Sequence, residues 1–337
     1  MYIMSVSALQ DARDKATAFE YDKAVKLYQE YLKENKTDAE AWTELGDILL
    51  KQGNLIESAD AYAAAYDLDS TNNNRAYRFG KALECLHEYD QAKALFEKAS
   101  KLSDGLKSKI KVGDILAETG KYDEALVLFT LLSDLYPENA TIQHRIARVY
   151  EALHRHAEAM QSLKKEVELR EKDALTTPSG KSWYLLGNAR AHLHLWDTAV
   201  SAYRKSYEIQ PLPDTRFCLG HSLILSGDVD EGKAEIFKAV DENGKDLQFL
   251  LKIGDALTDL GFYDDAITVY TKALEVRNVR ADTWAAIAYA LMKLGKKDEA
   301  RAFFEMAKAS AAIREMPWAD KLHKSEKTEC LDKELEN

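Results

Sequence analysis

The chain has few of the residues that interrupt helices or cross-link a fold. Only five prolines occur in 337 residues, and three of them lie where helices are expected to end. The three cysteines, Cys85, Cys218 and Cys330, are odd in number and far apart. We therefore expect neither a disulfide framework nor a thiolate metal site.

Long apolar runs and excess positive charge are also missing. The most apolar stretch, at 125–132, is far too short to span a bilayer. The N-terminus lacks the apolar stretch of a signal peptide, so we expect a cytoplasmic protein. A net charge of −11 argues against a protein that wraps duplex nucleic acid, because a basic face dominates that affinity. With 46% hydrophobic residues and scarce proline, the composition favours an almost wholly helical fold.

Internal repetition is what the sequence has in abundance. The stretches GDILLKQGN at 46–54, GDILAETGK at 113–121 and GDALTDLGF at 254–262 are near-copies of one another. A small residue recurs every 33 or 34 positions, with one interval of 40, at Ala12, Gly46, Gly80, Gly113, Ala147, Gly187, Gly220, Gly254 and Ala288. Sixteen residues after each lies a large residue, aromatic in seven of nine cases, at Tyr28, Tyr62, Phe96, Phe129, Leu163, Tyr203, Ile236, Tyr270 and Phe304. Nine units in phase define a repeat.

Helix packing explains this pattern. Trp42, Gly46 and Leu49 stand at i, i+4 and i+7, which is one stripe of a helix. The large residue belongs to a second helix, preceded four residues earlier by another small one. Small residues at matching heights allow two antiparallel helices to approach closely, and the aromatic ring fills the space beside them.

The segments WTELG and WYLLG, on a period of 34 residues, resemble the tetratricopeptide repeat. The resemblance covers residues 5–314 and implies a right-handed α-solenoid, a superhelix of helix-turn-helix units with a concave binding groove. It implies a single solenoid over 1–314, with units at about 5–38, 39–72, 73–105, 106–139, 140–173, 180–212, 213–246, 247–280 and 281–314.

Two segments depart from the period. An insertion at 174–179 contains Pro178, and we expect it to end one helix before Gly180 begins the next. It is interpreted as a tolerated surface-loop insertion, with a functional bend between repeat blocks as the alternative. The final segment, 315–337, is expected to form a short capping helix followed by a flexible acidic tail.

No motif in the sequence predicts catalysis or a cofactor. Gly227–Lys233 has the spacing of a phosphate-binding loop, but Ala234 stands where the motif requires Ser or Thr. Six of the eight histidines fall between 144 and 221, without a carboxylate or thiolate that completes a metal site. We therefore expect no enzyme activity, no cofactor and no bound metal.

Family analogy assigns the groove to the exposed face of each unit's first helix. The basic and aromatic residues predicted to line it are Arg78, Lys81, Lys111, His144, Arg145, Arg148, Tyr184, Asn188, Phe217 and His221. Such a groove favours an acidic or amphipathic partner segment, while the alternative is an ordinary solvated helix face. Capture of a chaperone's C-terminal carboxylate is disfavoured, because Tyr184, Cys218 and Gln248 occupy three of the five positions that it needs.

The sequence thus predicts a non-enzymatic adaptor that binds a protein or peptide in the groove, without nucleic acid or a membrane span. Arg78, Lys111, Arg145 and Arg148 are expected to set charge selectivity. The alternative is a structural role, in which the chain self-associates as a homo-oligomer or forms a fixed subunit of a larger assembly through its terminal repeats.

Overall fold

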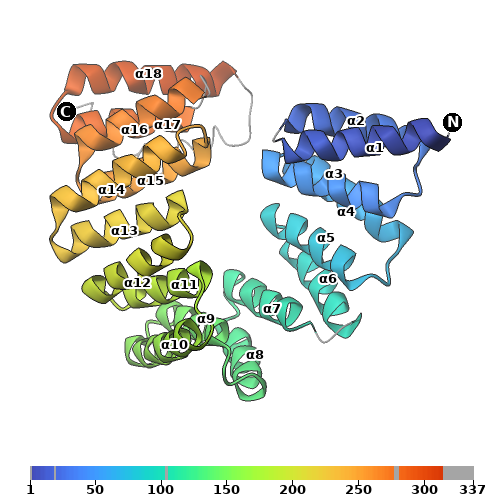
Figure 1. The fold of residues 1–337 in the computed structure, drawn as a ribbon, viewed down its shortest axis with the longest axis horizontal. Coiled ribbons are helices and arrows are strands. Elements are labelled where there is room, and N and C mark those ends of the chain that lie inside the picture. The colour runs from blue at the N-terminus through green and yellow to red at the C-terminus, as the bar shows by residue number, and fades with distance from the viewer. Residues whose placement is uncertain (1, 19, 103–104, 277–280, 314–337) are drawn as a thin grey trace. The chain divides into compact units, whose positions relative to one another are not determined.

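The structure is a computed structural model that describes residues 2–18, 20–102, 105–276 and 281–313. Within these ranges every regular element is helical, from α1 to α18 (Figure 1). The predicted all-α fold is confirmed. The helices group into two compact units, unit 1 at 1–165 and unit 2 at 166–337. The capping helix and tail predicted at 315–337 lie outside the described residues.

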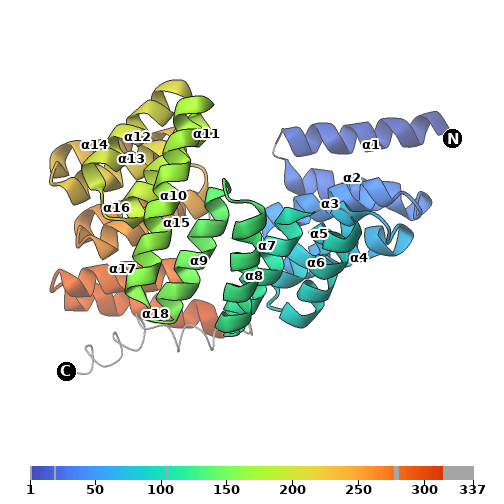
Figure 2. The same cartoon turned by 90° about the horizontal axis from the view of Figure 1, so that it is seen from below.

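Unit 1 is built from antiparallel pairs, in which an odd-numbered first helix packs on the even-numbered second helix that follows it. Each second helix also packs on the next first helix, so the pairs stack in order of sequence (Figure 2). The helices are α1 (Tyr2–Thr17), α2 (Tyr21–Glu34), α3 (Ala39–Gln52), α4 (Leu55–Leu68), α5 (Asn73–Cys85), α6 (Tyr89–Leu102), α7 (Leu106–Glu118), α8 (Tyr122–Leu135) and α9 (Ala140–Ala152).

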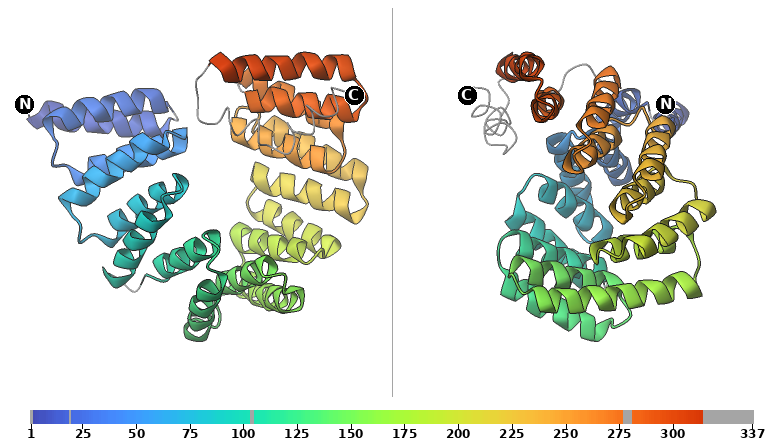
Figure 3. Two further views of the ribbon diagram at one scale, coloured as in Figure 1. Left: turned by 180° about the vertical axis from the view of Figure 1, so that it is seen from behind. Right: turned by 90° about the vertical axis from the view of Figure 1, so that its left-hand side faces the viewer.

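Unit 2 repeats the same arrangement (Figure 3). Its helices are α11 (Gly180–His192), α12 (Trp196–Ile209), α13 (Pro213–Ser226), α14 (Val229–Glu242), α15 (Leu247–Asp259), α16 (Tyr263–Val276), α17 (Ala281–Lys293) and α18 (Lys297–Ile313). The boundary between the units falls inside α10 (His156–Thr176). Whether the pairs form one continuous solenoid, as predicted, stays a prediction.

The loop between α10 and α11 is short because α10 extends into the insertion at 174–179. The helix continues to Thr176, and α11 begins at Gly180. Ser179 caps α11: its hydroxyl accepts the backbone N–H of Ser182, and the Ser182 hydroxyl accepts the backbone N–H of Ser179. This reciprocal capping box satisfies two N–H groups that a helix start leaves without partners. The expected break around Pro178 is therefore confirmed.

The turn that joins the two helices of a pair contains one residue in the left-handed backbone conformation, with a positive φ. Five described turns use glycine there, with φ between 76° and 109°. Three use histidine instead, His87, His154 and His194, with φ of 62°, 56° and 56°. Each histidine ring lies near the ring two residues later, such as His194 against Trp196 with centroids 5.3 Å apart. His154 and His194 therefore occupy equivalent turn positions in their helix pairs.

The core of five helix pairs rests on a contact between a glycine of the first helix and an aromatic ring of the second, as the repeat pattern predicts. A β-carbon added to Gly46 would lie 2.7 Å from the Tyr62 ring, and one added to Gly113 would lie 2.5 Å from the Phe129 ring. Tyr62 and Phe129 are almost fully buried. Glycine is therefore the residue that lets the ring lie directly against the backbone of the first helix.

The pair α13/α14 makes a closer contact, backbone against backbone. A β-carbon on Gly220 would lie 2.6 Å from the Gly232 carbonyl oxygen, and one on Gly232 would lie 2.6 Å from that of Gly220. Ile236 occupies the position that an aromatic ring takes in most other pairs, and it is fully buried. No side-chain rotation relieves such a contact, because both partners are main chain.

We therefore expect Gly232→Ala to lower the free energy of unfolding by about 1–3 kcal/mol, the usual cost of overpacking. The measurement is urea unfolding followed by circular dichroism. The control is Ala234→Ser, at an exposed position of the same helix, where we expect a change within about 0.5 kcal/mol. Equal stabilities for the two variants would contradict the backbone contact.

Candidate partner-binding site

The tyrosine that packs on the glycine also fixes the next residue of the first helix. Its hydroxyl donates to a polar side chain one position after the small residue, in the pairs Tyr62 to Asp47 (2.5 Å), Tyr203 to Asn188 (2.7 Å) and Tyr270 to Asp255 (2.8 Å). Burial raises the pKa of each of these three tyrosines, so the phenols stay protonated and remain donors at neutral pH. These polar residues are therefore held in place on the first helices.

Asp114 lacks this support because Phe129 stands in place of the tyrosine. Burial raises the pKa of Asp114, and the positive charge of Arg145 is the largest opposing influence. Arg145 Nε lies 2.6 Å from Asp114 Oδ1. For Asp114, an ion pair between the neighbouring first helices α7 and α9 takes the place of the tyrosine hydrogen bond.

Similar ion pairs join the first helices throughout unit 1, and we call them the ion-pair ladder. Each member links a basic residue to a carboxylate on an adjacent first helix. The members are Arg13–Glu44 (2.9 Å), Arg78–Asp47, Lys111–Glu84 (2.8 Å), Arg145–Asp114 (2.6 Å) and Arg148–Glu118 (3.7 Å).

Four of the predicted groove cations, Arg78, Lys111, Arg145 and Arg148, thus have carboxylate partners within the chain. Lys81 is exposed on α5, and His144 is half-buried on α9. An acidic ligand would have to compete with carboxylates already in place, which lowers the gain from pairing with these cations. The role predicted for these residues stays a prediction.

We expect charge reversal at Arg145 to lower the stability of the fold. Arg145→Glu places a second carboxylate beside the largely buried Asp114, so we expect the free energy of unfolding to fall by up to about 3–5 kcal/mol, the cost of breaking a buried ion pair. Arg148→Glu is the control, because both partners of that pair are about half exposed and its loss costs about 1 kcal/mol or less.

Thermal unfolding of both variants at several pH values tests this expectation. The deficit of Arg145→Glu should shrink as pH falls toward the raised pKa of Asp114, because protonation removes the repulsion between the two carboxyls. Equal deficits for the two variants, or a deficit that does not depend on pH, would contradict it.

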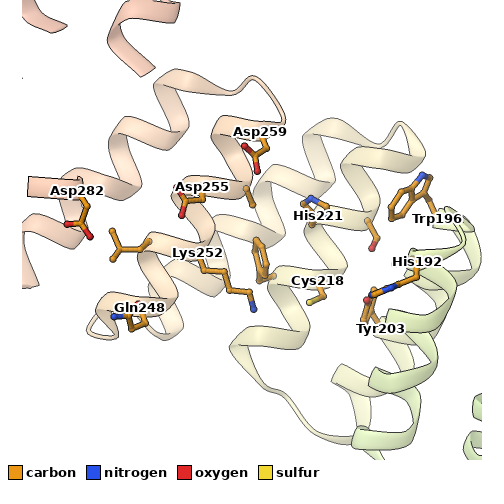
Figure 4. Close-up of a pocket in the computed structure, with 15 residues that line it drawn as sticks. His192, Trp196, Tyr203, Cys218, His221, Gln248, Lys252, Asp255, Asp259 and Asp282 are labelled. Carbon is orange, nitrogen blue, oxygen red and sulfur yellow. The ribbon is translucent and has the colours of Figure 1, made fainter. Parts of the chain in front are cut away.

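Unit 2 contains a cleft of about 840 Å³ formed by successive first helices and the start of α12 (Figure 4). Phe217 and His221 of α13 line it, with ring centroids 6.1 Å apart. The side chains labelled in Figure 4 are His192, Trp196, Tyr203, Cys218, His221, Gln248, Lys252, Asp255, Asp259 and Asp282. The structure thus brings two of the predicted residues, Phe217 and His221, into one cavity.

Tyr184 and Asn188 lie beside this cleft. The Tyr184 hydroxyl is 3.8 Å from Cys218 Sγ, and the Tyr184 and Tyr203 ring centroids are 5.9 Å apart. Burial raises the pKa of Tyr184 to about 12 and also raises that of the Cys218 thiol. Both groups are therefore neutral at pH 7, and the thiol has little thiolate character. All four residues predicted in this unit lie in or next to one site.

The sequence reasoning missed the acidic side of the cleft. Asp255, Asp259 and Asp282 line it but were not predicted as site residues. A signal existed for the first of them: Asp255 follows Gly254 in one of the repeated Gly-Asp dipeptides, at the position that accepts the hydrogen bond of the packed tyrosine.

Among the described residues, no helix is both long and apolar enough to cross a membrane. The same part of the chain contains no group of three histidine, cysteine or acidic side chains placed to hold a metal ion.

Paired helices in sequential stacks, with a cleft along their first helices, define the class of helical-repeat proteins. The sequence profile of the tetratricopeptide repeat matches residues 9–73, 110–174 and 251–312, more than half of the chain. The chain belongs to the tetratricopeptide repeat family, as its sequence predicts, and this is a family of protein-interaction scaffolds.

Two curated relatives share one region of similarity with the chain. The cytochrome c-type biogenesis protein CcmH of Escherichia coli (strain K12) is 30% identical over 136 residues, 39% of this chain and 37% of the relative. The protein of the same name from Shigella flexneri matches to the same extent. The alignment thus spans little more than a third of each relative's length.

Solved structures with a similar fold include MamA and TTC0263. A crystal structure of MamA is 22% identical, with a TM-score of 0.48, and covers 53% of this chain and 98% of its own. TTC0263, a tetratricopeptide repeat protein of Thermus thermophilus, is 22% identical, with a TM-score of 0.44, and covers 56% of this chain and 100% of its own.

Proposed function

We propose that this chain is a non-enzymatic adaptor that holds a segment of a partner protein in the cleft of unit 2. The observation that carries the proposal is the cleft itself. It is large enough for several side chains, has Phe217 on its wall, and offers polar groups from several first helices. Binding sites combine these features: an apolar floor with a few fixed polar groups.

The cleft is well suited to binding because its wall is preorganised. The Tyr203 hydroxyl fixes Asn188, and the Tyr270 hydroxyl fixes Asp255. Phe217 is nearly fully buried and contacts Phe249, with ring centroids 6.4 Å apart. A site whose side chains are already ordered has less entropy to lose when a segment binds.

Unit 1 is a weaker candidate for the same role. The ion-pair ladder already pairs Arg78, Lys111, Arg145 and Arg148, which are four of the cations predicted to line a groove there. A partner would have to displace these internal pairs, at a desolvation cost that new contacts must offset. The proposal therefore assigns partner binding to unit 2, and an acidic partner for unit 1 stays a prediction.

Filling the cleft should abolish partner binding. Ala256 lines the cleft on α15 and is half-buried, so Ala256→Arg places a long side chain inside it. The matched control is Ala234→Arg, at an exposed position of α14. The measurement is quantitative capture from the native lysate, read by mass spectrometry, after circular dichroism confirms that both variants fold.

The amount of each protein that the wild type and Ala234→Arg capture should fall at least tenfold with Ala256→Arg. This corresponds to a loss of binding free energy of about 1.4 kcal/mol or more. If the two variants capture the same proteins in equal amounts, partner binding in this cleft is refuted.

A second candidate function is self-association, and α8 supplies the observation that favours it. Val127, Leu131 and Leu135 stand at i, i+4 and i+8 and are 71%, 55% and 60% exposed. Apolar residues at this spacing form one continuous stripe on a helix, and contiguous exposed patches mark interaction surfaces.

Light scattering over a concentration series tests this role. We expect the wild-type mass to rise with concentration, and Leu131→Lys to shift the rise to at least tenfold higher concentration. Ile209→Lys, at an apolar residue of unit 2 that is 52% exposed and lies outside the α8 stripe, is the control and should leave the rise unchanged. A constant monomer mass would eliminate self-association.

A further inference from the structure

The side of the unit 2 cleft that α11, α12 and α13 form is rich in aromatic residues. Figure 4 shows Trp196, Tyr203, Cys218 and His221 grouped at this end of the cleft. Among the described residues that line this side, none is an aspartate, glutamate, lysine or arginine. A partner side chain that lies here therefore meets no carboxylate, ammonium or guanidinium from these three helices.

Burial favours the uncharged form of three ionisable groups on this side. It raises the pKa of the Tyr203 phenol and of the Cys218 thiol, and it lowers the pKa of His221. All three groups are therefore neutral at pH 7. A charged side chain of the partner would lose hydration here without gaining an opposite charge, so this side favours an uncharged one.

The aromatic rings on this side are held by neighbouring rings. The half-buried Trp196 packs edge to face on His194, with centroids 5.3 Å apart, and Tyr203 lies 5.9 Å from Tyr184. Aromatic rings attract one another in edge-to-face and offset arrangements, beyond the gain from buried apolar area. An aromatic side chain of the partner would therefore bind here more favourably than an aliphatic one.

Ser222 of α13 adds a polar group to this otherwise apolar side. It lines the cleft and is only 2% exposed, and within the described part of the chain its hydroxyl has no hydrogen-bond partner. Ser206 and Thr258, which are also buried in unit 2, donate instead to backbone carbonyl oxygens. A buried hydroxyl without a partner is costly, so a ligand that supplies a partner gains affinity.

We infer that the cleft holds its partner through an aromatic side chain that ends in a hydrogen-bonding group, namely tyrosine or tryptophan. The inference rests on the proposed function and names the residue that anchors the partner segment. The ring packs beside Trp196 and His221, and its hydroxyl or indole N–H forms a hydrogen bond with the Ser222 hydroxyl.

Phenylalanine would fill the same space but would cover Ser222 without giving its hydroxyl a partner. A site with a buried polar group discriminates against a ligand that lacks the matching group, because that polar group is then left unpaired. The cleft should therefore distinguish tyrosine from phenylalanine by hydrogen bonding rather than by size.

The test is selection of a displayed library of random dodecapeptides against the wild-type protein. Enriched peptides are then synthesised with a fluorescent label, and their dissociation constants are measured by anisotropy. Each peptide is also made with phenylalanine in place of its tyrosine or tryptophan. We expect tyrosine or tryptophan at one position of the enriched peptides.

The key variant is Ser222→Ala, which removes the hydroxyl and little else. The matched control is Ser108→Ala on α7 of unit 1, at a serine that is 5% exposed. Circular dichroism first confirms that both variants fold. Phenylalanine should weaken binding about fivefold in the wild type and the control, as expected for one net hydrogen bond. In Ser222→Ala it should cost less than about twofold, because no hydroxyl is then left unpaired.

The outcomes separate this inference from the proposed function. Enriched peptides that lack tyrosine and tryptophan, and that Ala256→Arg no longer binds, would overturn the aromatic anchor while supporting the cleft as the binding site. Peptides that bind Ala256→Arg as well as the wild type, or a library without enrichment, would overturn both. An equal cost of phenylalanine in Ser222→Ala and Ser108→Ala would overturn the role of Ser222.

Discussion

The contact between a glycine of the first helix and a ring of the second is the constraint on which the rest depends. It sets how closely two helices approach, and it brings the tyrosine hydroxyl within hydrogen-bond distance of the polar residue after the glycine. A core contact therefore determines which side chains are presented on the exposed face. In this fold, the same pair of residues sets the helix packing and orients the polar side chain beside the glycine.

The pair α7/α8 differs from the pairs that keep this tyrosine, such as Tyr62 in unit 1 and Tyr203 and Tyr270 in unit 2. In unit 1, Phe129 leaves Asp114 without a phenol donor, and Arg145 from the next first helix provides the compensating charge. In unit 2, tyrosines satisfy Asn188 and Asp255 directly. The Tyr270 hydroxyl thus holds the Asp255 carboxylate in place on α15.

Periodicity in the sequence predicted the helices, the pairing and the height at which Gly46 meets Tyr62, because all of these follow from local spacing. It also placed Phe217 and His221 on one face. It did not predict that Arg145 pairs with Asp114, 31 residues away, because that distance depends on the stagger of neighbouring first helices. The acidic side of the cleft was missed for the same reason: Asp259 and His221 come from different first helices, and they line one cleft only when those helices stack.

The glycine pair at the crossing of α13 and α14 bears on how such a protein diversifies. Gly220 and Gly232 lock the hairpin through main-chain atoms, so its geometry does not depend on any side chain of the exposed face. Cys218 and His221 line the cleft from the same helix. Substitutions there can change ligand preference while the hairpin keeps its shape, which makes this repeat a permissive position for acquiring new specificity.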